Sequence, residues 1–506
     1  MKRFITLAIL LLSACGGTSG GGPLGTNDGG FTVTDAGPTW TTAALIDGNS
    51  DAGLDLTSAV DNDGNPAVAY FRKDPNVFLS ACNADAGCPQ YALVIARESS
   101  TGAWTTEQVP AALDGGSLTG HYGLSLAFDP QNNPAVAYMG GDISFNDPDG
   151  VHDDRWIASL ASGDGPTAAR LPSDLVIARK SGTTWTRTTL ATSSDSIVSD
   201  KAQTTSSVDD QGAVTGLWAG LIFDKTPNSN SFHVVTRDLH FGAAAADFDG
   251  SNTEYAHFIS GQAKPDIGEM VSSRLFPTTD IFGKADSSQQ IHGGGTYSQL
   301  VLGSDGQPAV SFATDTVSSN GASQVWFARR TTAASLPAGT NAWTRTQVAN
   351  NQGRVGHGPS LAFSPTHGYA IALLGGTVGD GDLQVTFSAD GVTWPSLTTG
   401  GPNTVEALGD TGYHPSVDWS VDTLGLLYGF CHGTTFSGTT PCDPVAQQLR
   451  FRIPGANGPL STWSNPETVA SIVPDAAVLT HETSSGKFVA IWKEPGAGLK
   501  FSRRTP

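Results

Sequence analysis

A strand–turn–strand pattern recurs along this chain and constrains its fold more than any other feature. In each copy, a short apolar run is followed by a polar turn and a second apolar run. Val, Ala, Phe and Tyr favour a pleated, half-buried surface, whereas Asp-Gly and Asn-Pro favour tight turns. The copies are therefore predicted to be β-hairpins, and they cover residues 58–71, 125–139, 206–218, 299–313, 360–374, 416–430 and 476–492.

A second pair of predicted strands follows most copies, and its last strand opens near a tryptophan. Leu93–Arg97 leads to Trp104, and Leu175–Arg179 leads to Trp185. Two hairpins per unit make four antiparallel strands, and four-stranded units that repeat radially are the blades of a β-propeller. We therefore predict an all-β propeller of four-stranded antiparallel blades. The count is seven blades, with eight as the alternative.

The spacing of the copies predicts long loops and a closed ring. The second strands start about every 70 residues, more than the ~40–50 of common propeller repeats. The longest interval, Ala213 to Pro308, predicts an insertion around residues 219–296 or a degenerate extra blade. After the last hairpin only Leu499–Arg503 remains as a strand, and Thr39–Ala43 is similar to the outer strands of other units. An N-terminal strand would pair both open edges, which makes 39–506 one propeller domain.

The composition excludes several other classes. The 506 residues include 61 Gly and 29 Pro, and only 15% are charged. Coiled coils and helical solenoids need far fewer glycines, and collagen needs a three-residue glycine period that is absent. The formal net charge of −20 argues against a nucleic-acid partner, because phosphate contact needs a basic surface. We expect a monomer whose acidic surface favours cationic partners.

The N-terminus resembles the signal of a bacterial lipoprotein. Lys2 and Arg3 precede the apolar run Phe4–Leu12, which is too short to span a bilayer. The run ends in the letters LSAC, which resemble a lipobox. The resemblance implies a signal peptide of residues 1–14, cleavage before Cys15 and acylation of Cys15. An ordinary secretory signal with a chance cysteine is the alternative.

The same resemblance implies a location. Gly16 follows the cysteine where an Asp would favour retention at the inner membrane, so we expect the outer membrane or cell surface, with the lipid as the sole membrane anchor. Loss of Lys2 and Arg3 would take the charge from −20 to −22. Residues 15–38 are Gly-, Ser- and Thr-rich and cannot bury a core, so they are a predicted flexible tether.

The remaining cysteines are predicted to form two local disulfides. An extracytoplasmic location is oxidising and permits them. Cys82 and Cys88 are close in sequence, as are Cys431 and Cys442, and neither pair has zinc-finger spacing. Each bond would close one surface loop.

One segment resembles an Asp-box of the sialidase and BNR-repeat propellers. It reads Ser388-Ala389-Asp390-Gly391-Val392-Thr393-Trp394. In that family the box forms the turn between the third and fourth strands of a blade. Asp390 can accept backbone N–H bonds, Gly391 permits positive φ, and Trp394 can pack between blades, whereas Ser388 opens the box. Asp-boxes are structural, so the resemblance implies a fold and no activity.

A second sialidase-like motif is interpreted as structural. Phe451 to Pro454 spell FRIP, whose arginine binds the substrate carboxylate in sialidases. In that family the motif lies near the N-terminus, whereas here it lies near the C-terminus. Arg452 also stands at the end of a third strand as Arg97, Arg179 and Arg329 do, which indicates a repeated structural residue.

Four histidines stand just before the first strand of a hairpin copy, and they are the main candidate site. In a propeller the first strand lines the channel, so the loops that enter it face one mouth. Residues from several blades could therefore converge there. The histidines are His121, His292, His357 and His414, and they are accompanied by Tyr122, Tyr297, Tyr413 and Arg354.

Three interpretations of this cluster stay open. The four imidazoles could bind a transition metal. Alternatively, His121, His357 and His414 with Tyr122 and Tyr413 could be the base and acid that act on a uronate. Arg354 would then neutralise the carboxylate, in a type of site that propeller-fold polysaccharide lyases have. The third interpretation is that these polar residues satisfy backbone groups in Gly-rich rim loops.

Acidic turns at 61–65, 147–150 and 247–250 permit a structural calcium, although none has EF-hand spacing. P-loop, HExxH, GxSxG and dinucleotide motifs are absent from the sequence. The sequence therefore predicts a surface-anchored propeller that binds a protein or glycan at its channel mouth. The alternative is a carbohydrate-active enzyme (polysaccharide lyase or glycosidase-like) or a metal-dependent enzyme that uses the His/Tyr/Arg cluster.

Overall fold

The computed structural model describes most of the chain from residue 39 onward. The described residues are 39–78, 89–110, 123–140, 174–192, 214–226, 229–241, 248–262, 264–272, 294–314, 323–331, 342–352, 358–377, 380–395, 402–407, 410–431, 447–455, 462–474 and 476–505. Residues 38–506 form one compact unit. The predicted signal peptide, Cys15 and the tether lie outside the described residues, as do Cys82, Cys88 and Cys442.

The described strands form seven four-stranded antiparallel sheets. Blade 1 contains β2 (Ala52–Val60), β3 (Pro66–Phe78), β4 (Pro89–Glu98) and β5 (Trp104–Gln108). Blade 2 contains β6 (Leu124–Phe128), β7 (Pro134–Gly140), β8 (Asp174–Ser181) and β9 (Thr184–Thr192). Blade 3 contains β10 (Val214–Phe223), β11 (Phe232–Phe241), β12 (Phe248–Phe258) and β13 (Ile267–Ser272). Blade 4 contains β14 (Gly294–Leu302), β15 (Pro308–Thr314), β16 (Ser323–Arg330) and β17 (Trp343–Gln352).

The remaining three blades follow the same order. Blade 5 contains β18 (Ser360–Ser364), β19 (Gly368–Thr377), β20 (Asp380–Ser388) and β21 (Asn403–Glu406). Blade 6 contains β22 (Asp410–Ser420), β23 (Thr423–Cys431), β24 (Gln447–Arg452) and β25 (Glu467–Ala470). Blade 7 contains β26 (Ala477–Glu482), β27 (Lys487–Glu494), β28 (Gly498–Arg503) and, as its outer strand, β1 (Ala44–Asp47).

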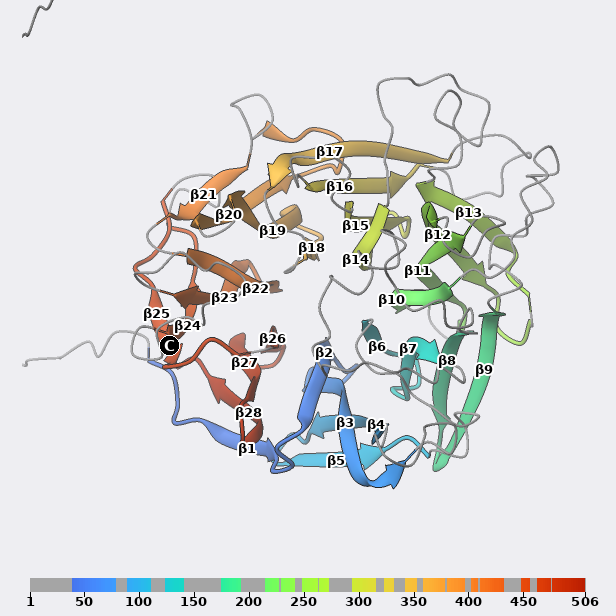
Figure 1. Ribbon diagram of the computed structural model, residues 1–506, viewed down its shortest axis with the longest axis horizontal. Coiled ribbons are helices and arrows are strands. Elements are labelled where there is room, and N and C mark those ends of the chain that lie inside the picture. Colours follow the sequence, from blue (N-terminus) through green and yellow to red (C-terminus); the bar gives the residue numbers. More distant parts are fainter. Residues whose placement is uncertain are drawn as a thin grey trace, which may run out of the picture. The chain divides into compact units, whose positions relative to one another are not determined.

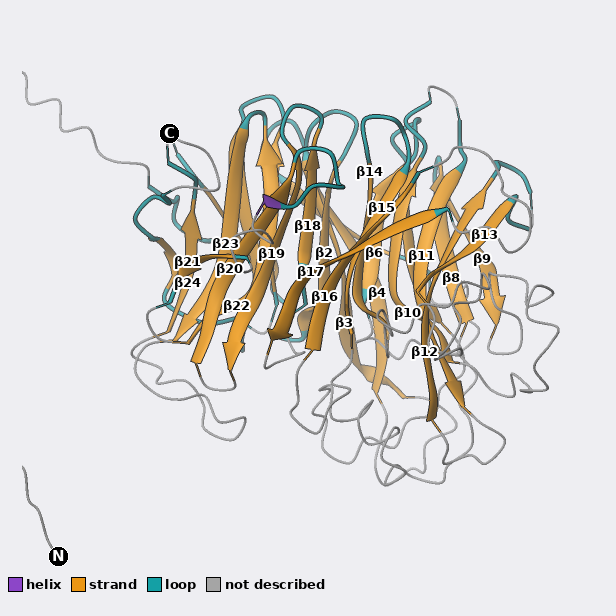
Figure 2. Cartoon of the chain, turned by 90° about the horizontal axis from the view of Figure 1, so that it is seen from above, coloured by secondary structure: helices purple, strands orange, loops and turns teal. Residues whose placement is uncertain are grey.

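The blades form a closed ring in chain order (Figure 1). The first strand of each blade contacts the first strand of the next, and β26 of blade 7 contacts β2 of blade 1. The short turns between first and second strands lie at one end of the sheets (Figure 2). We call this end the turn face. The predicted seven-bladed propeller is confirmed.

The N-terminal segment closes the ring as predicted. β1 pairs with β28, and Trp40 forms a bridge with Arg504. The N–H of Thr41 also donates to the carbonyl of Arg503 at 2.8 Å. The strand itself runs from Ala44 to Asp47, slightly later than the predicted Thr39–Ala43, and both segments lie along the last strand. The outer edge of blade 7 is thereby paired.

Within the described part of the chain, seven hydrophobic clusters hold the ring together, one at each interface between neighbouring blades. In the first, Phe71 of blade 1 packs with Tyr138 of blade 2 at 6.4 Å between ring centroids. In the cluster that closes the ring, Ile491 of blade 7 packs with Tyr70 of blade 1. Full burial of each such side chain contributes about 1.5–3 kcal/mol to the free energy of unfolding. Each interface between blades is therefore a separate hydrophobic core.

Hydroxyl groups also join the first strands. The Ser416 hydroxyl accepts the N–H of Leu479 in the next blade at 2.8 Å, and Ser360 accepts the N–H of Val417 at 3.0 Å. Ser125 accepts the N–H of Leu221 in the same way at 3.0 Å. These serines open the repeated sequence pattern, and they satisfy backbone groups across the blade interfaces.

Blade 3 differs from the expectation. The sequence predicts a hairpin at 206–218 and an insertion around 219–296, but Val214–Phe223 is a first strand and pairs with Phe232–Phe241. The hairpin turn is therefore the polar segment after Phe223. The letters DDQG at 209–212 have turn composition, but strand β10 begins after them. The range 219–296 holds most of a regular blade.

The turn that resembles an Asp-box lies between β20 and β21. Asp390 accepts the N–H groups of Val392 and Thr393 at 2.8 and 2.7 Å, and these bonds lower its pKa to about 2. Gly391 has a φ of 71°. Trp394 is buried against Phe327 of blade 4, with ring centroids 4.9 Å apart. The three residues have the physical roles expected of them, whereas membership of the sialidase family stays a prediction.

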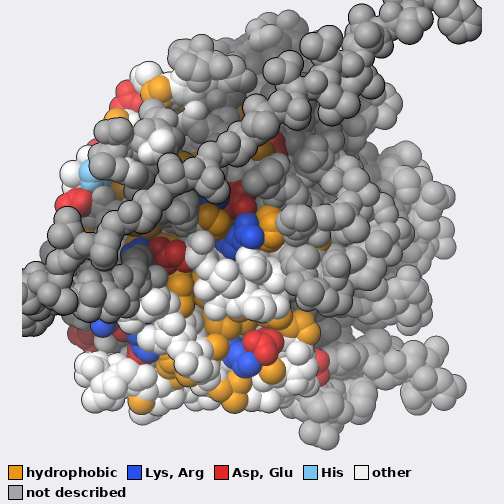
Figure 3. All heavy atoms as spheres, turned by 90° about the vertical axis from the view of Figure 1, so that its left-hand side faces the viewer, with side chains coloured by type: hydrophobic (Ala, Val, Ile, Leu, Met, Phe, Trp, Pro, Cys, Tyr) orange, Lys and Arg blue, Asp and Glu red, His pale blue; other side chains and the backbone are white. Residues whose placement is uncertain are grey.

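The register of β24 corrects one detail of the repeat. Arg97 pairs with Ala67, three residues before Tyr70, but Arg452 pairs with Leu426, two residues before the equivalent Tyr428. Arg452 is therefore one step out of register with Arg97 and points to the other face of its sheet. It forms an ion pair with Glu406 at 3.0 Å. Figure 3 shows acidic and basic side chains close together on this side of the ring.

Among the described residues, no helix has both the length and the apolar character needed to cross a bilayer.

Candidate functional site

Among the described residues, four first strands carry a non-glycine residue in the left-handed region of backbone conformation. These residues are Asp55 (φ 48°), Trp218 (46°), Tyr297 (54°) and His414 (45°). Each lies at a bulge, where the pairing with the second strand shifts. The other described non-glycine residues with positive φ are Asn132 and Val421, both in hairpin turns. Such strain costs about 1–3 kcal/mol per residue and is concentrated at functional sites.

The bulge residues occupy one equivalent position in their blades. After each bulge the strands return to register two residues later, at Thr57, Gly220, Gln299 and Ser416. In blades 2 and 5 the same position, two residues before Ser125 and Ser360, is held by Gly123 and Gly358. We call the six residues Asp55, Gly123, Trp218, Tyr297, Gly358 and His414 the axial layer.

Contacts run from blade to blade along this layer. The Asp55 carboxylate accepts the N–H of Gly123 at 3.2 Å. A β-carbon on Gly123 would lie 2.8 Å from Cα of Trp218, and the Trp218 and Tyr297 rings are 5.3 Å apart. A β-carbon on Gly358 would lie 2.1 Å from Tyr297. The bulges therefore bring residues from five consecutive blades into one continuous layer.

The exposed chemistry of the axial layer is a carboxylate, a phenol and an imidazole. Asp55, Tyr297 and His414 are half-buried, whereas Trp218 is only 7% exposed and its ring packs against that of Tyr297. The guanidinium of the buried Arg237 lies 5.2 Å from the Trp218 ring centre. Aromatic and hydrogen-bonding groups at the first strands are suited to a ligand with apolar and hydroxylated surfaces.

The predicted histidine cluster is only partly within the described residues. His414 lies in β22 and belongs to the axial layer, and the backbone of Tyr413 pairs with Gly429. His121, Tyr122, His292, Arg354 and His357 lie outside the described residues. The convergence of the four histidines and their metal therefore stay predictions. Of the four predicted histidines, His414 alone occupies the bulge position, two residues before Ser416, where the strand returns to register.

Asp55 and Trp218 are not among the predicted site residues, although a sequence signal accompanies them. Gly53, Gly216 and Gly412 each precede a bulge residue by two positions, with φ of 100°, 88° and 100°. The local sequence signature is therefore a glycine two positions before the bulge residue. It is weak in this chain because 61 glycines are present.

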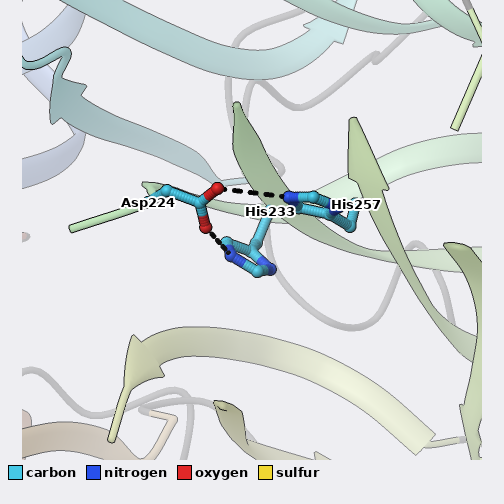
Figure 4. Close-up of side chains that lie close together, drawn as sticks. All are labelled: Asp224, His233 and His257. Carbon is cyan, nitrogen blue, oxygen red and sulfur yellow. Dashed lines mark hydrogen bonds and ion pairs between the residues drawn. The ribbon is translucent and has the colours of Figure 1, made fainter. Parts of the chain in front are cut away.

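A second cluster of polar side chains lies at the other end of β10 (Figure 4). Asp224 follows β10 directly, and its carboxylate oxygens lie 2.7 Å from Nε2 of His233 and 3.4 Å from Nε2 of His257. His233 lies on β11 and His257 on β12, where the two residues are paired in register. One ligand atom from each of the three residues lies within 4.8 Å of the others.

The electrostatics of this cluster follow from its contacts. Hydrogen bonds from His233 and His257 hold the pKa of Asp224 well below its usual range. Burial lowers the pKa of His233. Burial also acts to lower the pKa of His257, but the hydrogen bond to Asp224 and the charge of Asp266 outweigh it and raise that pKa. The two neighbouring imidazoles therefore differ in their readiness to carry a charge.

No family model matches the sequence, and the search of curated proteins returns no match. Solved structures similar to this chain include sialidase β-propellers. NanB sialidase from Streptococcus pneumoniae is 10% identical (92% of this chain, 70% of that one, TM-score 0.40). The polysaccharide lyase Uly1 is 10% identical (93% of both chains, TM-score 0.44). A protein of unknown function from Dyadobacter fermentans is 14% identical (75% and 93%, TM-score 0.40). Similarity this low carries no argument about function.

Proposed function

We propose that this chain is a lipid-anchored binding protein of the outer membrane or cell surface, and that the axial layer binds a glycan. The observation that carries the proposal is the set of strained bulges at Asp55, Trp218, Tyr297 and His414. A regular first strand would avoid this cost. A bulge re-aims a side chain, and strain kept at one equivalent position in four blades is accounted for by a ligand.

The chemistry of the layer favours a carbohydrate. A sugar presents an apolar face of C–H groups, which packs on an aromatic ring, and a rim of hydroxyls, which need both donors and acceptors. Tyr297, whose ring packs against that of Trp218, offers the aromatic surface. The carboxylate of Asp55 accepts hydrogen bonds, and the imidazole of His414 can donate or accept.

Glycan-array screening and calorimetry of the folded chain test this function. A hit is expected to bind the intact protein, and Tyr297→Ala is expected to weaken it tenfold or more, which corresponds to about 1.4 kcal/mol. Val421→Ala is the matched control, because Val421 is also strained (φ 53°) but lies in a hairpin turn. Absence of any hit, or equal losses in both variants, would contradict the proposal.

A second candidate function is a polysaccharide lyase that acts on uronates. A phenol and an imidazole in the same layer, at Tyr297 and His414, favour it because such pairs serve as acid and base. Incubation with uronate polysaccharides would then give an unsaturated product detectable by ultraviolet absorbance. His414→Ala should abolish the product while glycan binding remains measurable. Binding without any product would contradict the lyase function and would leave glycan binding as the only function of the two.

Anchoring is tested separately. Metabolic labelling with a fatty acid should mark the wild-type chain, and Cys15→Ser should remove the label and release the protein from the membrane fraction. Labelling that survives the substitution would contradict the predicted lipid anchor.

A further inference from the structure

Three blades offer an internal comparison at the position of the Asp224 cluster. In blades 1 and 2 an aspartate also follows the first strand directly, at Asp61 and Asp129. The residue after the start of the second strand is alanine in both blades, and the residue paired with it on the third strand is arginine. These pairs are Ala67 with Arg97 and Ala135 with Arg179. In blade 3 the corresponding pair is His233 with His257.

The aspartates differ in what they bind. Asp61 accepts the N–H groups of Asp63 and Asn65 in its turn and forms an ion pair with Arg97 at 2.5 Å. The carboxylate of Asp129 likewise accepts two N–H groups of its own turn. The Asp224 carboxylate instead lies against two imidazoles. Blades 1 and 2 therefore fold with Asp, Ala and Arg at these three positions, so the blade fold does not require the two histidines of blade 3.

Each imidazole is oriented from its other side. Nδ1 of His233 lies 2.6 Å from the hydroxyl of Tyr255, and Nδ1 of His257 lies 2.7 Å from the carboxylate of Asp266. Both Nε2 atoms are thereby directed toward Asp224. Partners of this kind fix the ring orientation of histidines that bind metals, and they include carboxylates.

We propose that Asp224, His233 and His257 form a binding site for a divalent transition-metal ion. Two imidazole nitrogens and one carboxylate oxygen are ligands that suit Zn²⁺, and the same set also serves non-haem Fe²⁺. Three protein ligands leave at least one coordination position for water or another ligand. The side chains are 23%, 8% and 14% exposed, so the site has contact with solvent.

This site is distinct from the axial layer and from the predicted histidine cluster. β10 carries Trp218 at its bulge and ends at Phe223, just before Asp224. The three ligands of the metal site all come from blade 3: Asp224 from the turn after β10, His233 from β11 and His257 from β12. The site therefore does not depend on the loops of other blades. The proposal therefore stands independently of glycan binding.

The decisive experiment measures metal content in the full mature chain. Protein dialysed against Zn²⁺ and then against buffer should retain one ion per chain, and the ion should raise the melting temperature. Co²⁺ in its place should give a visible absorption band typical of nitrogen and oxygen ligands. Elemental analysis of the protein as purified identifies which first-row ion it takes up in the cell.

The matched variant is His233→Ala with His257→Arg, which gives blade 3 the Asp–Ala–Arg set of blades 1 and 2. It should remain folded and bind no ion at this site, and its glycan binding should be unchanged. Asp224→Asn, which keeps shape and size, should weaken retention as a second test. His367→Ala changes a histidine on a different blade and should leave metal retention unchanged.

Three outcomes would overturn the proposal. Wild-type protein that is folded but can be loaded with neither Zn²⁺ nor Co²⁺ would show that the cluster is a hydrogen-bonded set only. Equal metal content in the wild type and the double variant would place the ion elsewhere. Loss of metal in His367→Ala to the same extent would do so too.

Asp266 is assigned as a positioning residue for the same site. It touches His257 and lies outside the ligand set. Asp266→Asn should lower the affinity for Zn²⁺ about 10–100-fold, the usual effect of removing such a partner, while one ion per chain still binds at saturation. A reduced stoichiometry would make it a ligand, and an unchanged affinity would remove it from the site.

Discussion

Gly358 lies directly against Tyr297 on the neighbouring first strand, so close that a β-carbon on Gly358 would come within 2.1 Å of Cβ and Cγ of Tyr297. The two residues occupy the same position in blades 5 and 4. One blade gives up its side chain so that the ring of the next can occupy that space. The two glycines of the axial layer, Gly123 and Gly358, therefore flank the large neighbouring side chains of Trp218 and Tyr297.

This contact predicts a coupled pair of substitutions. Gly358→Ala should destabilise the propeller by about 1–3 kcal/mol, because overpacking forces the neighbour to move. In a Tyr297→Gly background, which removes both Cβ and Cγ of Tyr297, the same substitution should cost far less. Urea unfolding of the four chains of this double-mutant cycle measures the coupling. Equal costs in both backgrounds would show that the Tyr297 side chain is not what the β-carbon meets.

His481 and Asp418 predict a pH dependence between blades 6 and 7. Nδ1 of His481 lies 2.6 Å from the Asp418 carboxylate. Burial acts to lower the pKa of His481, but the hydrogen bond and charge of Asp418 outweigh it, so the pKa is raised above 6.5. The contribution to stability is therefore complete below about pH 6.5 and is lost as the pH rises through the raised pKa.

Asp418→Asn provides the measurement for this pair. The free energy of unfolding of the wild type should exceed that of the variant below pH 6.5, and the difference should shrink as the pH rises. Chemical unfolding at a series of pH values gives both curves. A difference that grows with pH would have the wrong sign and would contradict the assignment.

Glu467 should contribute to ring closure. It accepts a hydrogen bond from the Trp40 indole at 3.1 Å and forms an ion pair with Arg504 at 2.9 Å, so it joins blade 6 to both chain segments that complete blade 7. Glu467→Ala should lower the free energy of unfolding by about 1.5–3 kcal/mol, as expected for hydrogen bonds to a charged group. Glu467→Gln keeps acceptor capacity and should cost less. An equal loss in both variants would assign the whole effect to charge.

The turn at Asp390 offers a test of local structure. Its carboxylate accepts two backbone N–H groups and the Thr393 hydroxyl. Asp390→Ala should therefore reduce stability by about 1–2 kcal/mol, whereas Asp390→Asn retains one acceptor oxygen and should lose less. Thermal unfolding of the two variants compares them. A cost below a few tenths of a kcal/mol for Asp390→Ala would show that water replaces these bonds fully.

The number of blades and their closure could be predicted from sequence because hairpins are local. Alternating apolar residues and turn chemistry specify each strand pair within about 15 residues, and the repeat of such pairs counts the blades. The roles of Asp390 and Gly391 are local in the same sense. Blade 3 shows the limit, because a polar segment at 209–212 resembles a turn as closely as the segment after Phe223 does.

What only the tertiary structure decided is which distant residues meet. Asp55 and Tyr297 are separated by more than 200 residues, and they share a layer because two bulges shift their strands by the same step and the ring brings the blades together. His233 and His257 face each other because of the register of β11 with β12, and a slip of one residue would turn them to opposite faces. The sequence by itself therefore determined the strands and the ring, whereas register and ring closure decided both candidate sites.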